Sequence, residues 1–273
     1  MSVKGISNVE EGVKKITGIS IASAGQLIVR GLGDRYSTTT LNGLPIASPN
    51  PDNKLIPLDL FPTSTVKNIT VSKVYEANTF ADYSGAHIDI STKESTGGDF
   101  FNIGFNMGGQ FNTLLQDFYT MDRAQSLFKN PGIDSRFINM EKTEFETAVK
   151  NENPFNTTFD VKKRISLPNF SGNIAGGKDW EVGGQTLSLL ASFTASNGEQ
   201  TTRDAFFRTL EAGGSTLDRF NYDSYAQELK LGALANLSYT LRTADHIGYT
   251  FFYSRNIVDT YMRREGIDYE DHN

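Results

Sequence analysis

The stretch VRGLGDRYSTTTLNGLPI, residues 29–46, decides how the first third of the chain folds. Its Asn42-Gly43 pair separates the threonine-rich run 38–41 from the returning run 44–46, and Asn-Gly between two such runs is the strongest short-range signal for a β-hairpin. The matching turn requires positive φ at both central residues, which asparagine and glycine tolerate best. The stretch therefore predicts a strand, a type I′ turn and a proline-stiffened return.

Gly31 and Gly33 flank a single leucine and raise the question of a nucleotide site. A dinucleotide fingerprint needs a third glycine and a helix immediately after it, and a P-loop ends in Gly-Lys-Ser/Thr. The sequence after Gly33 has neither feature. Backbone geometry is the better explanation for these glycines.

Composition narrows the class of protein. The chain has 273 residues, with 25 glycines and 19 phenylalanines, which favours strands and turns over a helical bundle. A net charge of −6 argues against a nucleic-acid partner, and the absence of cysteine excludes a disulfide scaffold or a thiolate metal site. No run of about 18 apolar residues predicts a transmembrane helix, and the first residues lack the apolar run of a signal peptide.

A short helix is predicted near the start of the chain. Residues 7–10, Ser-Asn-Val-Glu, fit a capping box. Val9, Val13 and Ile16 then fall on one helical face, and Gly18 is suited to a left-handed stop. Short β-like runs broken by turn residues follow this helix.

Three segments occur in a fixed order: VRGLGDRYSTTTLNGLPI, LDLFPTSTVKNITVSK (58–73) and DYSGAHIDISTK (82–93). This succession resembles the plug domain of TonB-dependent outer-membrane receptors. Plugs of that family carry an Arg-Gly strand, a Leu-Asn-Gly-x-Pro hairpin, a Val-x-x-Ile-x-Val strand and a closing Tyr-Gly segment that ends in Ile-x-Ile-x-Thr-Lys. The resemblance covers about residues 8–93, and the family's closing glycine pair is replaced here by Gly85-Ala86.

The rest of the chain alternates apolar or small residues with polar ones, the pattern of a strand with two unlike faces. Soluble strands most often have about 5–6 residues, whereas a tilted membrane-spanning strand needs about 9–11. The longest run favours the second class. The alternation predicts five strands, at residues 101–111, 170–176, 187–195, 229–241 and 247–253.

The predicted connections alternate in length. A polar excursion at about 113–167 is followed by the short link 178–185, a second excursion at about 198–227 and the short link 242–246. Long extracellular loops and short periplasmic turns alternate in this way in outer-membrane barrels. Inside the first excursion, residues 120–130 and 140–151 are candidates for short helices.

The predicted fold class is mainly β with a small α+β plug. A plug domain at residues 1–95 is followed, at 96–273, by the first five antiparallel strands of an incomplete transmembrane β-barrel. A barrel wide enough to hold a plug has about 22 strands, so we expect an interior fragment of a longer receptor.

The resemblance implies a receptor in the outer membrane of a Gram-negative bacterium, surrounded by outer-membrane lipids. It would bind an extracellular small ligand such as a siderophore, glycan or peptide. TonB, with its inner-membrane energising complex, would then displace the plug and admit the ligand to the periplasm. No catalytic set, cofactor or metal site is expected. The alternative is a soluble or surface-anchored all-β binding or adhesion module without transport, which would bury its alternating faces between two sheets.

Candidate site residues follow from the resemblance and from the turns. In the family the arginine of the Arg-Gly strand pairs with glutamates of the barrel wall, which implies a plug–barrel contact for Arg30. Ligand contact is expected at outward turns, either in the proline-rich loop 48–54 or in segment 78–83. The residues expected to shape the hairpin and turns are Gly31, Gly33, Asn42, Gly43 and Gly85, and those expected to meet the ligand are Asn50, Asp52, Asn53 and Tyr83.

Overall fold

The computed structural model describes residues 13, 17–21, 27–29, 31–49, 53–77, 79–80, 82–94, 96–121, 133–154, 160–241 and 245–268. The chain divides into two compact units. Unit 1 comprises Met1–Gly108, Asn169–Asn197 and Glu228–Ile257, and unit 2 comprises Gly109–Pro168, Gly198–Gln227 and Val258–Asn273. Each unit is described by itself.

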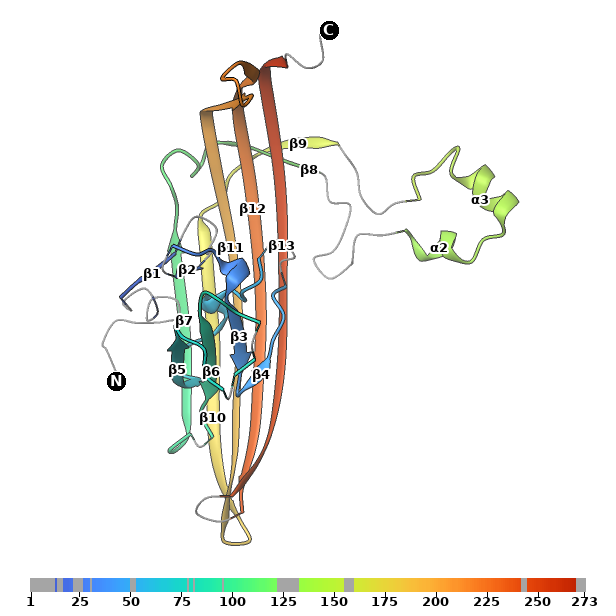
Figure 1. The fold of residues 1–273 in the computed structure, drawn as a ribbon. Helices are drawn as coiled ribbons and strands as arrows, with labels where there is room; N and C mark the ends of the chain where they lie inside the picture. Colours follow the sequence, from blue (N-terminus) through green and yellow to red (C-terminus); the bar gives the residue numbers. More distant parts are fainter. Residues whose placement is uncertain are drawn as a thin grey trace. The chain divides into compact units, whose positions relative to one another are not determined.

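The N-terminal part of unit 1 contains two small sheets (Figure 1). The first pairs β1 (Ile19–Ile21) with β2 (Leu27–Val29) in antiparallel register. The second has four strands in the order β4-β3-β6-β5, and its β3–β6 pair is parallel whereas its other pairs are antiparallel. The strands of this sheet are β3 (Thr38–Leu41), β4 (Leu44–Pro45), β5 (Val66–Ser72) and β6 (His87–Thr92), and two 3₁₀ helices accompany them, η2 (Asp34–Tyr36) and η3 (Leu58–Leu60).

The predicted hairpin is confirmed. Asn42 and Gly43 have φ of 53° and 78°, the positive values that a type I′ turn requires, and Leu41 pairs with Leu44 across the turn. The predicted left-handed stop at Gly18 is also confirmed, with φ of 79°. Of the predicted first helix only Val13 is described, and it is helical; the capping box lies outside the described residues.

The hydrophobic core of unit 1 lies on one face of this four-stranded sheet. Ile88 and Ile90 of β6 are fully buried, and Phe61 and Ile56 from the η3 region pack with them. Their burial follows the period-two pattern of the strand, which sends His87 and Asp89 to the opposite face. Full burial of each such apolar side chain stabilises the fold by about 1.5–3 kcal/mol.

The long sheet has five strands in the order β13-β12-β11-β10-β7, with β7 and β13 as its two edges. The β7–β10 and β10–β11 pairs are antiparallel. The five predicted strands are thus confirmed, and the sheet does not close on itself. Its strands are β7 (Phe100–Gly108), β10 (Asn169–Val182), β11 (Gln185–Leu210), β12 (Thr216–Thr240) and β13 (His246–Asp268).

The first predicted strand was drawn too long. β7 ends at Gly108, and Phe111, which continues the alternation in sequence, lies beyond it with 99% of its surface exposed. A turn takes over at that point, because the backbone N–H groups of Thr113 and Leu114 both donate to the carbonyl of Gln110. A turn residue can continue an alternating pattern by chance, so the prediction from the pattern alone extended the strand beyond its real end.

The second long loop, predicted at about 198–227, is wrong because most of this stretch is strand. β11 and β12 continue through most of it, and only a tight turn joins them, closed by the Glu211 N–H donating to Ser215 and by Gly214 at φ of 87°. Exposed polar side chains such as Arg203 and Arg208 interrupt the apolar face while the backbone pairing persists. The prediction followed the apolar face alone, so it ended the third strand too early and began the fourth strand too late.

The first excursion has structure of its own, within unit 2. β8 (Asp117–Met121) pairs antiparallel with β9 (Val161–Ile165), and two short helices follow β8, α2 (Ser135–Ile138) and α3 (Lys142–Ala148). The helix predicted within 140–151 is confirmed as α3. The one predicted at 120–130 is wrong at Thr120 and Met121, which belong to β8, and the rest of it lies outside the described residues. No helix among the described residues is long and apolar enough to cross a membrane.

Candidate functional site

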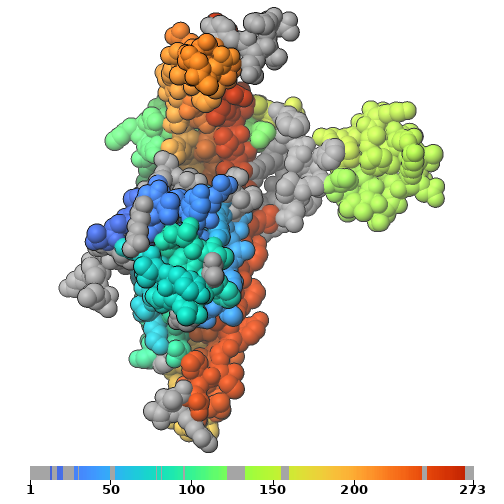
Figure 2. Space-filling model, in the orientation of Figure 1, coloured from blue at the N-terminus to red at the C-terminus, as the bar shows by residue number. Residues whose placement is uncertain are grey.

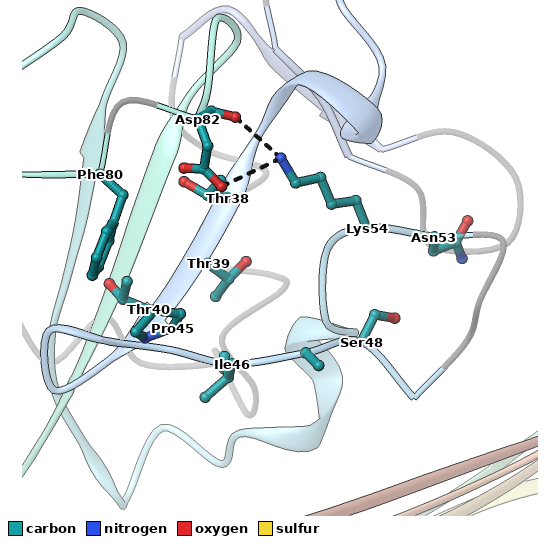
Figure 3. Close-up of a pocket in the computed structure, with 11 residues that line it drawn as sticks. Thr38, Thr39, Thr40, Pro45, Ile46, Ser48, Asn53, Lys54, Phe80 and Asp82 are labelled. Atoms are coloured by element: carbon teal, nitrogen blue, oxygen red, sulfur yellow. Dashed lines mark hydrogen bonds and ion pairs between the residues drawn. The ribbon is translucent and has the colours of Figure 1, made fainter.

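A pocket of about 770 Å³ lies on the four-stranded sheet (Figure 3). Strand β3 contributes residues 38–40, and β4 with the chain that follows it contributes residues 45–48. Two further segments complete the lining, with Asn53 and Lys54 from one and Phe80 and Asp82 from the other. All of these residues belong to unit 1.

The pocket brings together the two segments in which ligand contact was predicted. The Lys54 Nζ donates to the backbone carbonyl of Asp82 at 3.2 Å and lies 3.8 Å from its carboxylate (Figure 3). The backbone N–H of Lys54 donates to the Asp34 carboxylate at 3.0 Å, which fixes the end of the loop. Loop 48–54 and segment 78–83 are therefore tied to each other and to η2.

The structure gives different outcomes for the four residues predicted to contact the ligand. Asn53 lines the pocket, and Asn50 and Asp52 lie outside the described residues. Tyr83 is not part of the lining; its hydroxyl donates to the carbonyl of Val74 at 2.9 Å, and its ring packs against His87. The aromatic ring of the pocket belongs to Phe80, which is 51% exposed and was missed in the sequence.

A buried network lies behind the pocket wall. Thr40 Oγ1 donates to Asp89 Oδ1 at 2.6 Å, so its single proton is used there. It therefore accepts from the Nε2–H of His87, 3.3 Å away, and the His87 Nδ1 accepts from Thr38 Oγ1 at 3.1 Å. His87 is only 6% exposed, so this arrangement holds β3 and β6 together on the face opposite the apolar core.

Thr39 differs from its two neighbours. Its side chain is 5% exposed, and within the described part of the chain its hydroxyl has no hydrogen-bond partner. Thr39 also lines the pocket. A buried hydroxyl without a partner costs about 1–3 kcal/mol, and this oxygen has almost no accessible surface of its own.

The predicted turn glycines have two different roles. Gly31 has φ of 78° and needs glycine for its backbone, whereas Gly33 has φ of −68° and does not. Gly85 is required by packing: a Cβ built there would lie 2.6 Å from the Ser37 hydroxyl and 3.2 Å from the Tyr36 carbonyl. That close approach matches two short bonds, from the N–H groups of Ser84 and Gly85 to the Tyr36 carbonyl.

Comparison with known families identifies this part of the chain. Residues 1–87 match the family model described as TonB-dependent Receptor Plug Domain. No curated protein matches the chain. We therefore call the part of unit 1 that contains β1 to β6 the plug, and the five-stranded sheet the wall.

The plug lies on one face of the wall strands within unit 1 (Figure 2). That face carries mainly short polar side chains, with glycine and two leucines among them, whereas most large apolar side chains of the same strands alternate with them and point away. The buried set on β11 and β12 is Ser188, Leu190, Ser192, Thr194, Gly232, Leu234, Asn236 and Ser238, and the exposed set includes Leu189, Phe193 and Leu237.

An ion pair joins plug to wall. The Lys230 Nζ on β12 lies 3.2 Å from Asp59 Oδ2 in η3 and 3.3 Å from Glu228 Oε2, and only 14% of its side chain is exposed. The predicted contact had the opposite polarity, with Arg30 of the plug facing wall glutamates. Arg30 lies outside the described residues, and its pairing stays a prediction.

Further plug–wall contacts are mostly hydrogen bonds. Asn42 Nδ2 donates to Thr250 Oγ1 at 2.9 Å, and Asn236 Nδ2 donates to the Lys93 carbonyl at 3.0 Å. An apolar contact accompanies them, the stacked rings of Phe61 and Phe252 with centroids 5.2 Å apart. The alternation in sequence placed Lys230 and Asn236 on the polar face of their strand, but it gave no sign of their partners.

Proposed function

We propose that the chain is the plug and adjoining wall of a TonB-dependent receptor in the outer membrane of a Gram-negative bacterium. The receptor binds an extracellular ligand at the plug pocket and imports it when TonB, driven by its inner-membrane complex, displaces the plug. Residues 1–95 are the moving domain, and residues 96–273 are wall strands in contact with outer-membrane lipids. The receptor acts by transport and needs no cofactor.

One observation carries this proposal: a plug-family domain contacts the polar face of strands whose opposite face is apolar and exposed. Phe101, Ile103 and Phe105 of β7 are each 66–68% exposed. In water such a surface is unfavourable, whereas in a bilayer it meets acyl chains. A soluble adhesion module would have to cover these side chains with a second sheet, and the described residues supply none there.

The proposal is tested in a Gram-negative host that carries the complete gene. Three strains grow in the same complex medium: the wild type, a strain without the gene and a strain without TonB. Mass spectrometry of the spent medium then shows which solutes each strain removes. We expect at least one solute whose removal requires both the gene and TonB. If every solute removed by the wild type is also removed by one of the two mutants, the transport function is wrong.

A further inference from the structure

The face of the wall that points away from the plug has a groove of about 740 Å³. It is lined by β7, β10 and β11, which are neighbours in the sheet (Figure 1). The floor is small, because Gly176 on β10 pairs with Ala191 on β11. The rim is formed by large apolar side chains that are each 37–68% exposed, namely Phe101, Ile174, Trp180, Leu189 and Phe193.

The groove has the length of one membrane leaflet. From Ile174 to Trp180 the strand advances about 20 Å, since each residue adds about 3.3 Å. Barrel strands tilt by about 35–45°, so this stretch covers about 15 Å along the membrane normal. That is half of a hydrocarbon core of about 30 Å, and a single acyl chain therefore fits along the groove.

One end of the groove is polar. Lys178 is the only charged residue among the described lining residues, and its Nζ lies 3.3 Å from the carboxylate of Asp99, the residue before β7. The same ammonium lies 6.0 Å from the centre of the Trp180 ring. This end adjoins the tight β10–β11 turn, and aromatic residues commonly mark the membrane surface at such strand ends. A polar end near the surface and an apolar hollow deeper in match the order of groups in a phospholipid.

The ion pair at this end favours a headgroup that carries both signs of charge. The side chains of Lys178 and Asp99 are 54% and 61% exposed, so each has room for a second partner. A phosphate would contact Lys178, and a primary ammonium on the same headgroup would donate to Asp99. A trimethylated ammonium has no N–H to donate. A headgroup with a phosphate and no cation is repelled by the Asp99 carboxylate.

These features identify one occupant, and the inference rests on the proposed function, which places this face in the membrane. We infer that the groove is a binding site for one zwitterionic phospholipid with a primary ammonium, such as a phosphatidylethanolamine. One acyl chain lies over Gly176 and Ala191, and the headgroup bridges Lys178 and Asp99. The site differs from ordinary contact with the bilayer because it discriminates between headgroups.

Trp180 reports on this groove directly, because it is the single tryptophan of the chain. The complete chain is placed in amine oxide micelles that contain one brominated phospholipid at a series of mole fractions, and bromine quenches tryptophan fluorescence only at short range. The probes are phosphatidylethanolamine, phosphatidylcholine and phosphatidylglycerol with the same dibrominated acyl chains. We expect half-maximal quenching at a mole fraction about 2- to 5-fold lower for phosphatidylethanolamine than for the other two.

Three variants test the assigned contacts, with quenching expressed relative to each variant's own fluorescence without brominated lipid. Asp99→Asn should abolish the preference for phosphatidylethanolamine over phosphatidylcholine and strengthen quenching by phosphatidylglycerol. Lys178→Met should weaken quenching by all three lipids about 2- to 5-fold. Ala191→Leu fills the floor and should weaken quenching by phosphatidylethanolamine.

Lys67→Met is the matched control for Lys178→Met. Lys67 also pairs with a carboxylate, that of Glu94 at 2.9 Å, and its side chain is 55% exposed, but it lies on β5 of the plug. This variant should keep the wild-type order of the three lipids. Circular dichroism checks that all variants fold like the wild type.

Three outcomes overturn the inference. Equal quenching by the three lipids, or a preference that persists in both Asp99→Asn and Lys178→Met, would mean contact with bulk lipid alone, and the transport function would stand. Absence of quenching in a chain that light scattering shows to be a dimer would assign the groove to a second copy. Absence of quenching in a monomer would mean that this face does not meet lipid, and the proposed function would fail with the site.

Discussion

Gly85 shows how a single missing Cβ controls the packing of the plug. This glycine, two residues before β6, approaches Ser37 and Tyr36 so closely that any side chain must displace one of them. We predict that Gly85→Ala destabilises the chain by about 1–3 kcal/mol through this overpacking. Urea unfolding in detergent, followed by circular dichroism, measures the difference.

Gly33→Ala is the matched control for Gly85→Ala. Gly33 has a negative φ, and a Cβ there meets no heavy atom within 4 Å. The substitution should be neutral or stabilise the chain by up to about 1 kcal/mol, because alanine has less freedom in the unfolded state. Equal losses in the two variants would show that close approach is not what Gly85 provides.

His87 offers a second residue-scale prediction. Its ring bridges Thr38 and Thr40, and Leu at position 87 would leave the buried Thr40 hydroxyl and the half-buried Thr38 hydroxyl without this partner. We expect His87→Leu to destabilise the chain by about 1–3 kcal/mol. His87→Gln keeps a donor and an acceptor and should lose less. The ranking of the two thermal midpoints checks the network; a more stable leucine variant would contradict it.

At the scale of elements, local turns could be predicted from sequence and contacts between distant segments could not. The Asn42-Gly43 turn depends on the φ preferences of two adjacent residues, and these preferences follow from the residue types alone. The pocket depends on Lys54 reaching Asp82, and no local pattern records that contact. The aromatic ring and hydroxyl of Tyr83 predict a ligand contact, but the backbone directs this side chain toward Val74. Phe80 lines the pocket instead.

The wall strands illustrate a second limit at this scale. Alternation identified all five because their apolar and polar faces differ in the part that contacts the plug. Residues 199–204 of β11 are polar on both faces, and the apolar residues 205–207 that follow are consecutive, so the alternation disappears while the pairing with β12 continues. Backbone hydrogen bonds, which every residue can make, decide where a strand ends.

The ion pair between η3 and β12 provides a prediction about how elements are joined. Lys230→Met would leave Asp59 and Glu228 without their shared cation in a poorly hydrated site. We expect a loss of about 1.5–3 kcal/mol and faster proteolysis of the plug. Limited trypsin digestion of the chain in detergent, with mass spectrometry of the fragments, measures the detachment.

The control for that experiment is Lys178→Met on β10. Lys178 also pairs with a carboxylate, Asp99, but more than half of its side chain is exposed. Exposed pairs contribute about 0–1 kcal/mol, so this variant should digest like the wild type. A wild-type digestion rate in Lys230→Met as well would mean that the Asp59 pair does not hold the plug.

The whole molecule has one surface that water cannot accommodate. Large apolar side chains on the outer face of the wall each gain about 1.5–3 kcal/mol on full burial, and the edges β7 and β13 add backbone groups that can template aggregation. The sequence pattern predicts that the outward-facing side chains are Phe101, Ile103, Phe105, Phe111, Leu187, Leu189, Phe193, Leu229, Leu231, Leu237, Ile247 and Phe251, of which Phe111 lies in the turn beyond β7.

We therefore predict that residues 1–273 aggregate without detergent, whereas residues 1–95 remain soluble when expressed alone. Size-exclusion chromatography with light scattering distinguishes the two, and adding detergent to the longer chain is the control. A monodisperse, detergent-free monomer of all 273 residues would favour the soluble all-β module over the barrel wall.

The short polar side chains beneath the plug have a mechanical consequence. Each hydrogen bond between Asn42, Asn236 and their partners can be exchanged for one with water, at a net cost of about 1 kcal/mol. The stacked pair Phe61–Phe252 and the buried Leu234, which packs in the core cluster of the plug, are apolar exceptions. Under the proposed function, we expect a pull on the plug to break these hydrogen bonds one at a time, each against a small barrier.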